Sequence, residues 1–247
     1  MAIEREEAIV LSRSRFGETS LIVTLFTRGR GPLRFMVKGA RRPRSRFGGC
    51  LEPTNHLLAV YYRKEGRDLH LLAQADLVAS FPGLRGSLLR LAYAYAIIDA
   101  LVGLKREETP AEKLFRLALE ALGTLDGGAE EDLEPALWSF LLAALADAGY
   151  RPELERCLRC GRVVRGSGAR FDSRAGGVVC ARHGEGGLSL SAGTIEFLGG
   201  LAAGARRKTP LTRRETAEGR EALRRFLQEH GLGRAPFRSL EILAPSA

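Results

Sequence analysis

The fold is decided by Thr19-Ser-Leu-Ile-Val-Thr-Leu-Phe-Thr27 and Pro32-Leu-Arg-Phe-Met-Val-Lys38, two runs of strand length rich in β-branched and aromatic residues. Three more runs of this kind occupy residues 8–12, 57–62 and 69–74, and turn-forming residues separate all five. Five short strands in residues 1–80 predict a small closed barrel, most commonly a five-stranded OB-fold. A small open sheet is the alternative.

Charge is unevenly distributed along the 247 residues. Residues 1–80 hold 14 basic and 8 acidic groups, a net charge of +6. Residues 81–150 hold 6 and 11, a net charge of −5, and residues 151–247 hold 18 and 10, a net charge of +8. A genome that favours arginine codons would enrich arginine throughout, so this asymmetry indicates separate modules and a localised site for a polyanion.

The strongest basic run lies in the predicted barrel, where no acidic residue occurs between Glu18 and Glu52. Such a run can neutralise backbone phosphates, and Phe35 and Phe47 within it offer rings that could stack on unpaired bases. The alternative is a solvated basic loop without a partner, and Phe35 is expected in the core rather than at the surface. We therefore predict a nucleic-acid-binding ridge of eight residues: Arg28, Arg30, Arg34, Lys38, Arg41, Arg42, Arg44 and Arg46.

A second pattern has the spacing of a metal site. Cys157-Leu-Arg-Cys160 is followed after nineteen residues by Cys180-Ala-Arg-His183, so two ligand pairs on short turns are joined by one loop. This arrangement predicts one structural Zn²⁺ held by three cysteines and one histidine. A redox Cys-x-x-Cys is the rival, and the second pair argues against it. Cys50 is expected to be a free thiol.

Apolar residues recur at helical spacing from about residue 82, and they predict three helices up to residue 148. Residues 191–198 and 213–230 predict two more. The predicted class is therefore an α+β multidomain protein. Its parts are an OB-fold nucleic-acid-binding domain (1–80), the first part of a helical domain (81–150), a zinc-binding module (151–188) and the C-terminal part of the helical domain (189–247). A candidate second DNA surface comprises Arg206, Arg207, Lys208 and Arg224.

Several classes of protein are disfavoured. No apolar run approaches the roughly 20 residues of a membrane span, and the acidic start does not resemble a signal peptide, so we expect a cytoplasmic protein without a membrane partner. A nuclease with a metal centre would need a carboxylate cluster or an open zinc position, and neither is evident in the sequence. A zinc-containing RNA-binding or translation factor built on an OB-fold remains the alternative to a DNA-binding protein.

The chain resembles the bacterial recombination mediator family RecO. The resemblance rests on Gly17-Glu-Thr-Ser-Leu-Ile-Val and Lys38-Gly-Ala-Arg-Arg near the start, and on Gly149-Tyr-Arg-Pro-Glu-Leu-Glu-Arg-Cys157-Leu-Arg-Cys160-Gly downstream. The second ligand pair departs from the second Cys-x-x-Cys of many members, because position 183 is His.

The resemblance implies an OB-fold, a helical domain and an embedded zinc module. It also implies a non-enzymatic role in DNA repair: binding single- and double-stranded DNA, annealing complementary strands, and helping load RecA onto strands coated by single-stranded-DNA-binding protein. The implied partners are RecR, RecF and the acidic C-terminal tail of the coating protein, and the implied location is the nucleoid.

Overall fold

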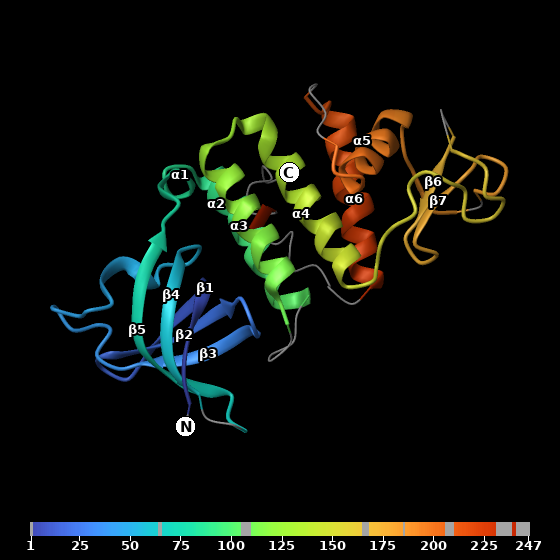
Figure 1. Ribbon diagram of the computed structural model, residues 1–247. Helices are drawn as coiled ribbons and strands as arrows, with labels where there is room; N and C mark the ends of the chain where they lie inside the picture. Colours follow the sequence, from blue (N-terminus) through green and yellow to red (C-terminus); the bar gives the residue numbers. More distant parts are fainter. Residues whose placement is uncertain are drawn as a thin grey trace.

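The computed structural model describes residues 2–63, 66–104, 110–164, 168–184, 186–205, 210–230 and 239–240. Figure 1 shows a long molecule with a β-barrel at one end, helices in the middle and a small β-module at the other end. None of the described helices is long and apolar enough to cross a lipid bilayer.

The five expected strands are all present and form an OB-like closed barrel in the order β1-β2-β3-β5-β4. Neighbouring strands are antiparallel except β3 and β5, which pair in parallel. The strands are β1 (Ala2–Phe16), β2 (Ser20–Thr27), β3 (Gly31–Val37), β4 (His56–Arg63) and β5 (Leu69–Ala79). β1 begins earlier than its apolar run, because residues 2–7, three of which are glutamates, pair with β4.

The middle of β1 is buried on both faces. Ala8 and Val10 point into the barrel, whereas Ile9 and Leu11 belong to the core of the helical domain. Alternate residues of a strand lie on opposite faces, so a run that is apolar at every position can serve two cores at once. The barrel and the helices therefore share a wall.

The helical domain consists of α1 (Pro82–Arg85), α2 (Leu88–Leu104), α3 (Glu112–Gly127), α4 (Leu133–Asp147), α5 (Ala192–Ala202) and α6 (Arg213–Glu229). The single helix expected from residue 82 is interrupted, since α1 ends at Arg85 and α2 starts at Leu88. Trp138 of α4 is fully buried against Phe197 of α5. A Cβ at Gly219 of α6 would collide with the Trp138 ring, so only glycine allows this close approach.

The polar contacts between helices are concentrated on α6. Arg220 donates to Glu134 of α4 through Nε at 2.8 Å and Nη2 at 2.6 Å, and Nη2 also donates to the Tyr93 hydroxyl of α2 at 2.9 Å. The Tyr93 hydroxyl donates in turn to Glu134, which is buried. Burial and the adjacent Glu134 carboxylate raise the pKa of Tyr93. These three groups hold α2, α4 and α6 together.

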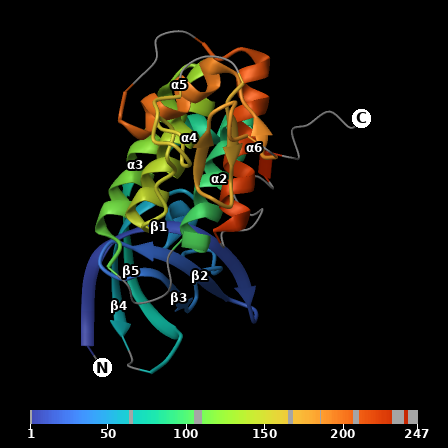
Figure 2. The same ribbon diagram turned by 90° about the vertical axis from the view of Figure 1, so that its right-hand side faces the viewer.

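The small module is inserted between α4 and α5. Its sheet has the order β7-β6-β8, formed by β6 (Arg170–Asp172), β7 (Gly177–Val179) and β8 (Leu188–Ser189). Figure 2, which views the molecule from the module end, shows this sheet in front of the helices and the barrel below them. Strands of two or three residues are marginally stable by themselves, and Phe171 of β6 and Val178 of β7 are buried in the core of the helical domain.

Candidate nucleic-acid interface and metal centre

The predicted ridge is divided by the fold, and two of its eight residues are paired with carboxylates. Arg28 contacts Glu7 of β1 at 3.4 Å and Glu112 at the start of α3 at 2.5 Å. Arg30 donates to Glu4 through Nε at 3.0 Å and Nη2 at 3.1 Å. The charges at this end of the predicted ridge therefore have acidic partners, and contact of Arg28 and Arg30 with nucleic acid stays a prediction. Acidic residues distant in sequence reach the turn between β2 and β3 because β1 extends to Ala2.

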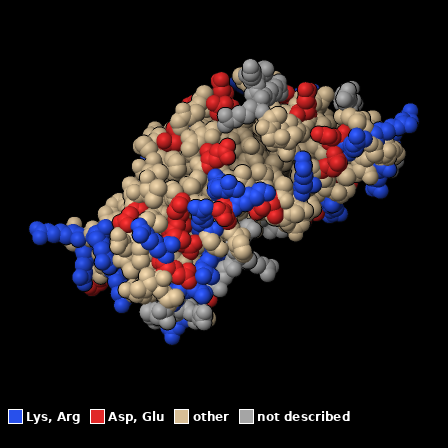
Figure 3. All heavy atoms as spheres, viewed as in Figure 1, with Lys and Arg blue, Asp and Glu red and all other residues tan. Residues whose placement is uncertain are grey.

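The other six residues form what we call the barrel basic surface. Each side chain is exposed, and none is paired with a carboxylate in the described part of the chain. The surface comprises Arg34, Lys38, Arg41, Arg42, Arg44 and Arg46. Figure 3 shows Lys and Arg side chains projecting at this end of the molecule.

The loop that carries most of this surface is anchored to the hairpin between β1 and β2. The backbone N–H of Arg41 donates to the Thr19 carbonyl at 2.9 Å, and its guanidinium donates to the Glu18 carbonyl at 2.9 Å. Arg46 lies over the ring of Phe47, 5.3 Å from its centroid. These contacts order the loop without neutralising its charge, because carbonyls and rings carry no net charge.

Of the two aromatic residues within the ridge, Phe35 lies in the core as expected, and Phe47 is buried as well. Neither ring can therefore stack on a base. Phe16 at the end of β1 is 47% exposed instead, and Arg15 beside it is exposed as well. Both lie on the hairpin that holds the basic loop. The alternation Ser12-Arg13-Ser14-Arg15 was the available sequence signal, since it marks an extended β1 with an outward polar face.

The candidate second DNA surface is only partly described. Arg206, Arg207 and Lys208 lie outside the described residues. Arg224 donates to Glu221 through Nε at 2.8 Å and Nη2 at 2.7 Å. The neighbouring Arg225 also donates to Glu221, at 2.6 Å. The positive charge on this part of α6 is therefore partly offset within the helix, because one glutamate faces two arginines.

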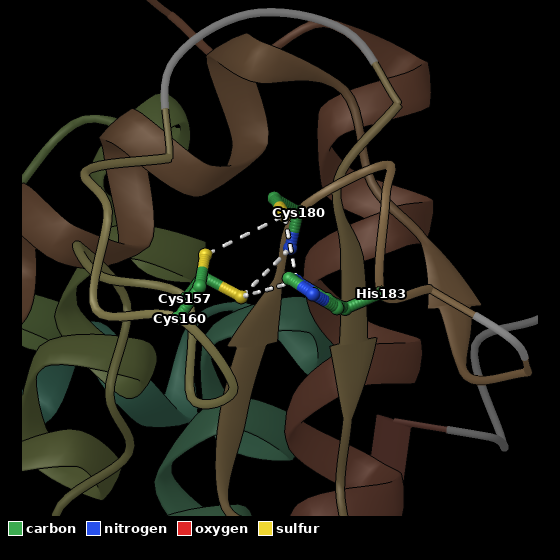
Figure 4. Close-up of side chains that lie close together, drawn as sticks. All are labelled: Cys157, Cys160, Cys180 and His183. Carbon is green, nitrogen blue, oxygen red and sulfur yellow. Dashed lines mark hydrogen bonds between the residues drawn. The ribbon is translucent and has the colours of Figure 1, made fainter.

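The four predicted metal ligands come together in the small module. The ligand atoms of Cys157, Cys160, Cys180 and His183 all lie within 4.8 Å of one another. Figure 4 shows the three thiols and the imidazole turned toward a common point. Tight turns place them there: the Gly161 N–H donates to the Cys157 carbonyl at 2.8 Å, and the His183 N–H donates to the Cys180 carbonyl at 2.9 Å.

The distances between these atoms fit a tetrahedral ion. Zn–S bonds of about 2.3 Å and Zn–N bonds of about 2.0 Å place sulfur atoms about 3.8 Å apart and sulfur and nitrogen about 3.5 Å apart. The Cys160 and Cys180 sulfurs are 4.0 Å apart, and Nδ1 of His183 lies 3.3 Å from Cys180 and 3.7 Å from Cys157. His183, which departs from the Cys-x-x-Cys pattern, therefore faces the sulfurs.

The surroundings of Cys157 favour a thiolate, which is the form that binds metals. Burial opposes ionisation, but backbone N–H groups, including that of Cys180 at 3.3 Å, outweigh it and lower the pKa of Cys157 to about 5. Cys50, as expected, is a free cysteine; it lies in the barrel, where burial raises the pKa of its thiol.

Comparison with known proteins decides the family. The model for "Recombination protein O N terminal" matches residues 1–81, and the model for "Recombination protein O C terminal" matches residues 85–241. The chain belongs to the RecO family. The boundary between the two RecO models falls at α1, where the barrel gives way to the helices.

Relatives in the RecO family match nearly the whole chain. The DNA repair protein RecO of Anaeromyxobacter sp. (strain K) is 40% identical, over 96% of this chain and 95% of its own. The DNA repair protein RecO of Rubrobacter xylanophilus is 38% identical, over 96% and 94%. The resemblance read from the sequence is thus confirmed at the level of the family.

Proposed function

We propose that this RecO-family chain is a non-enzymatic recombination mediator in DNA repair. It binds single- and double-stranded DNA, anneals complementary strands, and helps load RecA onto strands coated by single-stranded-DNA-binding protein. It works at the nucleoid in the cytoplasm with RecR, RecF and the acidic C-terminal tail of the coating protein. The observation that carries the proposal is the barrel basic surface, six exposed cations without a described carboxylate partner.

The chemistry of this surface suits a polyanion without sequence specificity. Arginine binds phosphate oxygens through two parallel N–H groups, and each neutralised phosphate releases condensed counterions. Two strands bound close together at such a surface repel each other less, and base pairing then supplies the specificity. Phe16 could stack on an unpaired base, because any base offers a π face.

For the module we propose one structural Zn²⁺ held by Cys157, Cys160, Cys180 and His183. The ion would supply folding free energy that the short strands β6–β8 cannot provide. Cys160→Ser should abolish stoichiometric zinc in the purified protein and expose the module to limited proteolysis. Proteolytic resistance that is unchanged after complete removal of zinc would contradict a structural role.

The decisive experiment is annealing of two complementary oligonucleotides, each precoated with single-stranded-DNA-binding protein. We expect this chain to accelerate duplex formation without any nucleotide cofactor. This acceleration should be smaller when the oligonucleotides are coated with a protein that lacks its acidic C-terminal tail. Tight DNA binding without acceleration would reduce the proposal to a nucleic-acid-binding barrel, and preference for structured RNA would favour an RNA factor instead.

A further inference from the structure

The turns that carry the metal ligands also carry exposed arginines. Arg159 precedes Cys160, Arg162 follows it by two residues, and Arg182 precedes His183. All three are exposed. Because the neighbouring ligand atoms lie within 4.8 Å of one another, these residues emerge from one small region of the surface. We call Arg159, Arg162 and Arg182 the knuckle surface.

The knuckle surface is not used by contacts within the described chain. No described carboxylate forms an ion pair with any of these three side chains. Two nearby carboxylates are occupied by backbone groups: Glu153 accepts from the N–H groups of Glu155 and Arg156, and Asp172 accepts from those of Arg174 and Ala175. Arg174 of the same module, by contrast, contacts Glu229 of α6 at 3.4 Å.

The position of the knuckle surface matters as much as its charge. The module and the barrel lie at opposite ends of the molecule, with the helices between them (Figure 1). Figure 3 shows Lys and Arg side chains at both ends of the face that it presents. A nucleic-acid strand held at the barrel therefore leaves the knuckle surface available for a second segment.

We infer that the knuckle surface is a second nucleic-acid contact, which binds the phosphates of a strand separate from the one at the barrel. This inference rests on the proposed function and specifies how one protein can hold two strands. Arginine favours phosphate because its planar guanidinium matches two oxygens at once. The exposed side chains of Leu158 and Val163 on the same turns can contact sugars and base faces.

The test uses fluorescence anisotropy of a labelled single-stranded oligonucleotide at several salt concentrations. The full-length protein carrying R41E/R42E/R44E is the background, since these changes remove three charges from the barrel basic surface. In that background R159A/R182A should lower the remaining affinity by about tenfold and reduce the slope of log K against log salt by about 1.4, the value for two phosphate contacts on a single strand. R174A/R214A is the matched control, because it removes two arginines that are paired with Glu229 and Glu218.

The arginines could instead serve to offset the negative charge of a zinc site with three thiolates. Zinc content separates the two roles: a second DNA contact predicts that R159A/R182A keeps one zinc per chain and its thermal midpoint. Equal oligonucleotide affinities of the R159A/R182A and R174A/R214A variants would overturn the inference. It would be overturned in that case even if the knuckle surface bound an acidic apolar peptide. Loss of zinc together with loss of binding would overturn it as well. Failure of the unmodified protein to bind DNA would refute the proposed function itself.

Discussion

The loop of the barrel and helix α6 are both rich in arginine, yet their charges are used in opposite ways. The loop arginines are exposed and have no carboxylate partner in the described part of the chain, whereas Arg214, Arg220, Arg224 and Arg225 of α6 each contact a glutamate. A helix places a residue beside those three and four positions away, so charges of opposite sign cancel locally. A loop between two strands offers no such neighbours. The position of carboxylates relative to the arginines, more than the number of arginines, therefore distinguishes a binding surface from a structural one.

The largest effect should come from reversing the charges of the loop. R41E/R42E/R44E should weaken DNA binding more than thirtyfold at about 0.15 M salt, similarly for all sequences, because about three phosphate contacts become repulsions. The slope of log K against log salt should fall by about 2.7 or more. Filter binding or anisotropy over a salt series measures both.

The matched control is R213E/R214E/R225E on α6, which changes the net charge equally. It should leave affinity within about threefold if position rather than net charge decides binding. Equal losses of DNA affinity in the two triple variants would contradict the proposed difference between the loop and α6.

A smaller effect, on stability alone, is expected at Arg220. Arg220→Ala leaves Glu134 buried with only Tyr93 beside it, and it should lower the free energy of unfolding by about 2–3 kcal/mol. The partial exposure of Arg220 places this below the full cost of breaking a buried pair. Denaturant unfolding measures the change, and Arg213→Ala should be nearly neutral. DNA affinity per folded molecule should be unchanged; a parallel loss would make α6 part of the interface.

Whether a structural feature can be predicted from the sequence depends on whether its contacts are local or distant along the chain. The strand cores, the helices and the clustering of the four candidate metal ligands are encoded by short-range periodicity or spacing, and the sequence predicts them. The pairing of Arg28 with Glu112 and of Arg30 with Glu4 depends on residues 84 and 26 positions away. No local pattern contains that information, and the burial of Phe47 likewise depends on how the loop folds onto the barrel.

Acid should reveal the structural role of a carboxylate on α6. Burial raises the pKa of Glu218, but hydrogen bonds from Ser191 and Thr194 outweigh it and lower that pKa from 4.5 to about 2. Because the folded-state pKa is depressed, Glu218 stabilises the fold above pH 4.5, and this stability is lost as pH falls toward 2. Glu218→Gln should cost about 1–2 kcal/mol at neutral pH and less in acid. Chemical denaturation at several pH values measures this; an unchanged pH profile would contradict it.

The smallest effect is expected at Arg224, the described member of the candidate second DNA surface. Arg224→Ala should change DNA affinity by less than about 0.5 kcal/mol, because Glu221 already offsets its charge. Anisotropy under the conditions of the loop variants measures this. A tenfold loss of DNA affinity would instead indicate that this part of α6 contacts DNA.

The buried contact between Trp138 and Gly219 also provides a spectroscopic probe. Trp138 is the only tryptophan among the 247 residues, and it lies on α4 of the helical domain. Its fluorescence should therefore report melting of the helices, while far-UV circular dichroism follows the whole chain. Since Ile9 and Leu11 of the barrel belong to the helical core, we expect the two signals to change together during unfolding. If the barrel unfolded separately and first, part of the far-UV ellipticity would be lost before the Trp138 emission shifts.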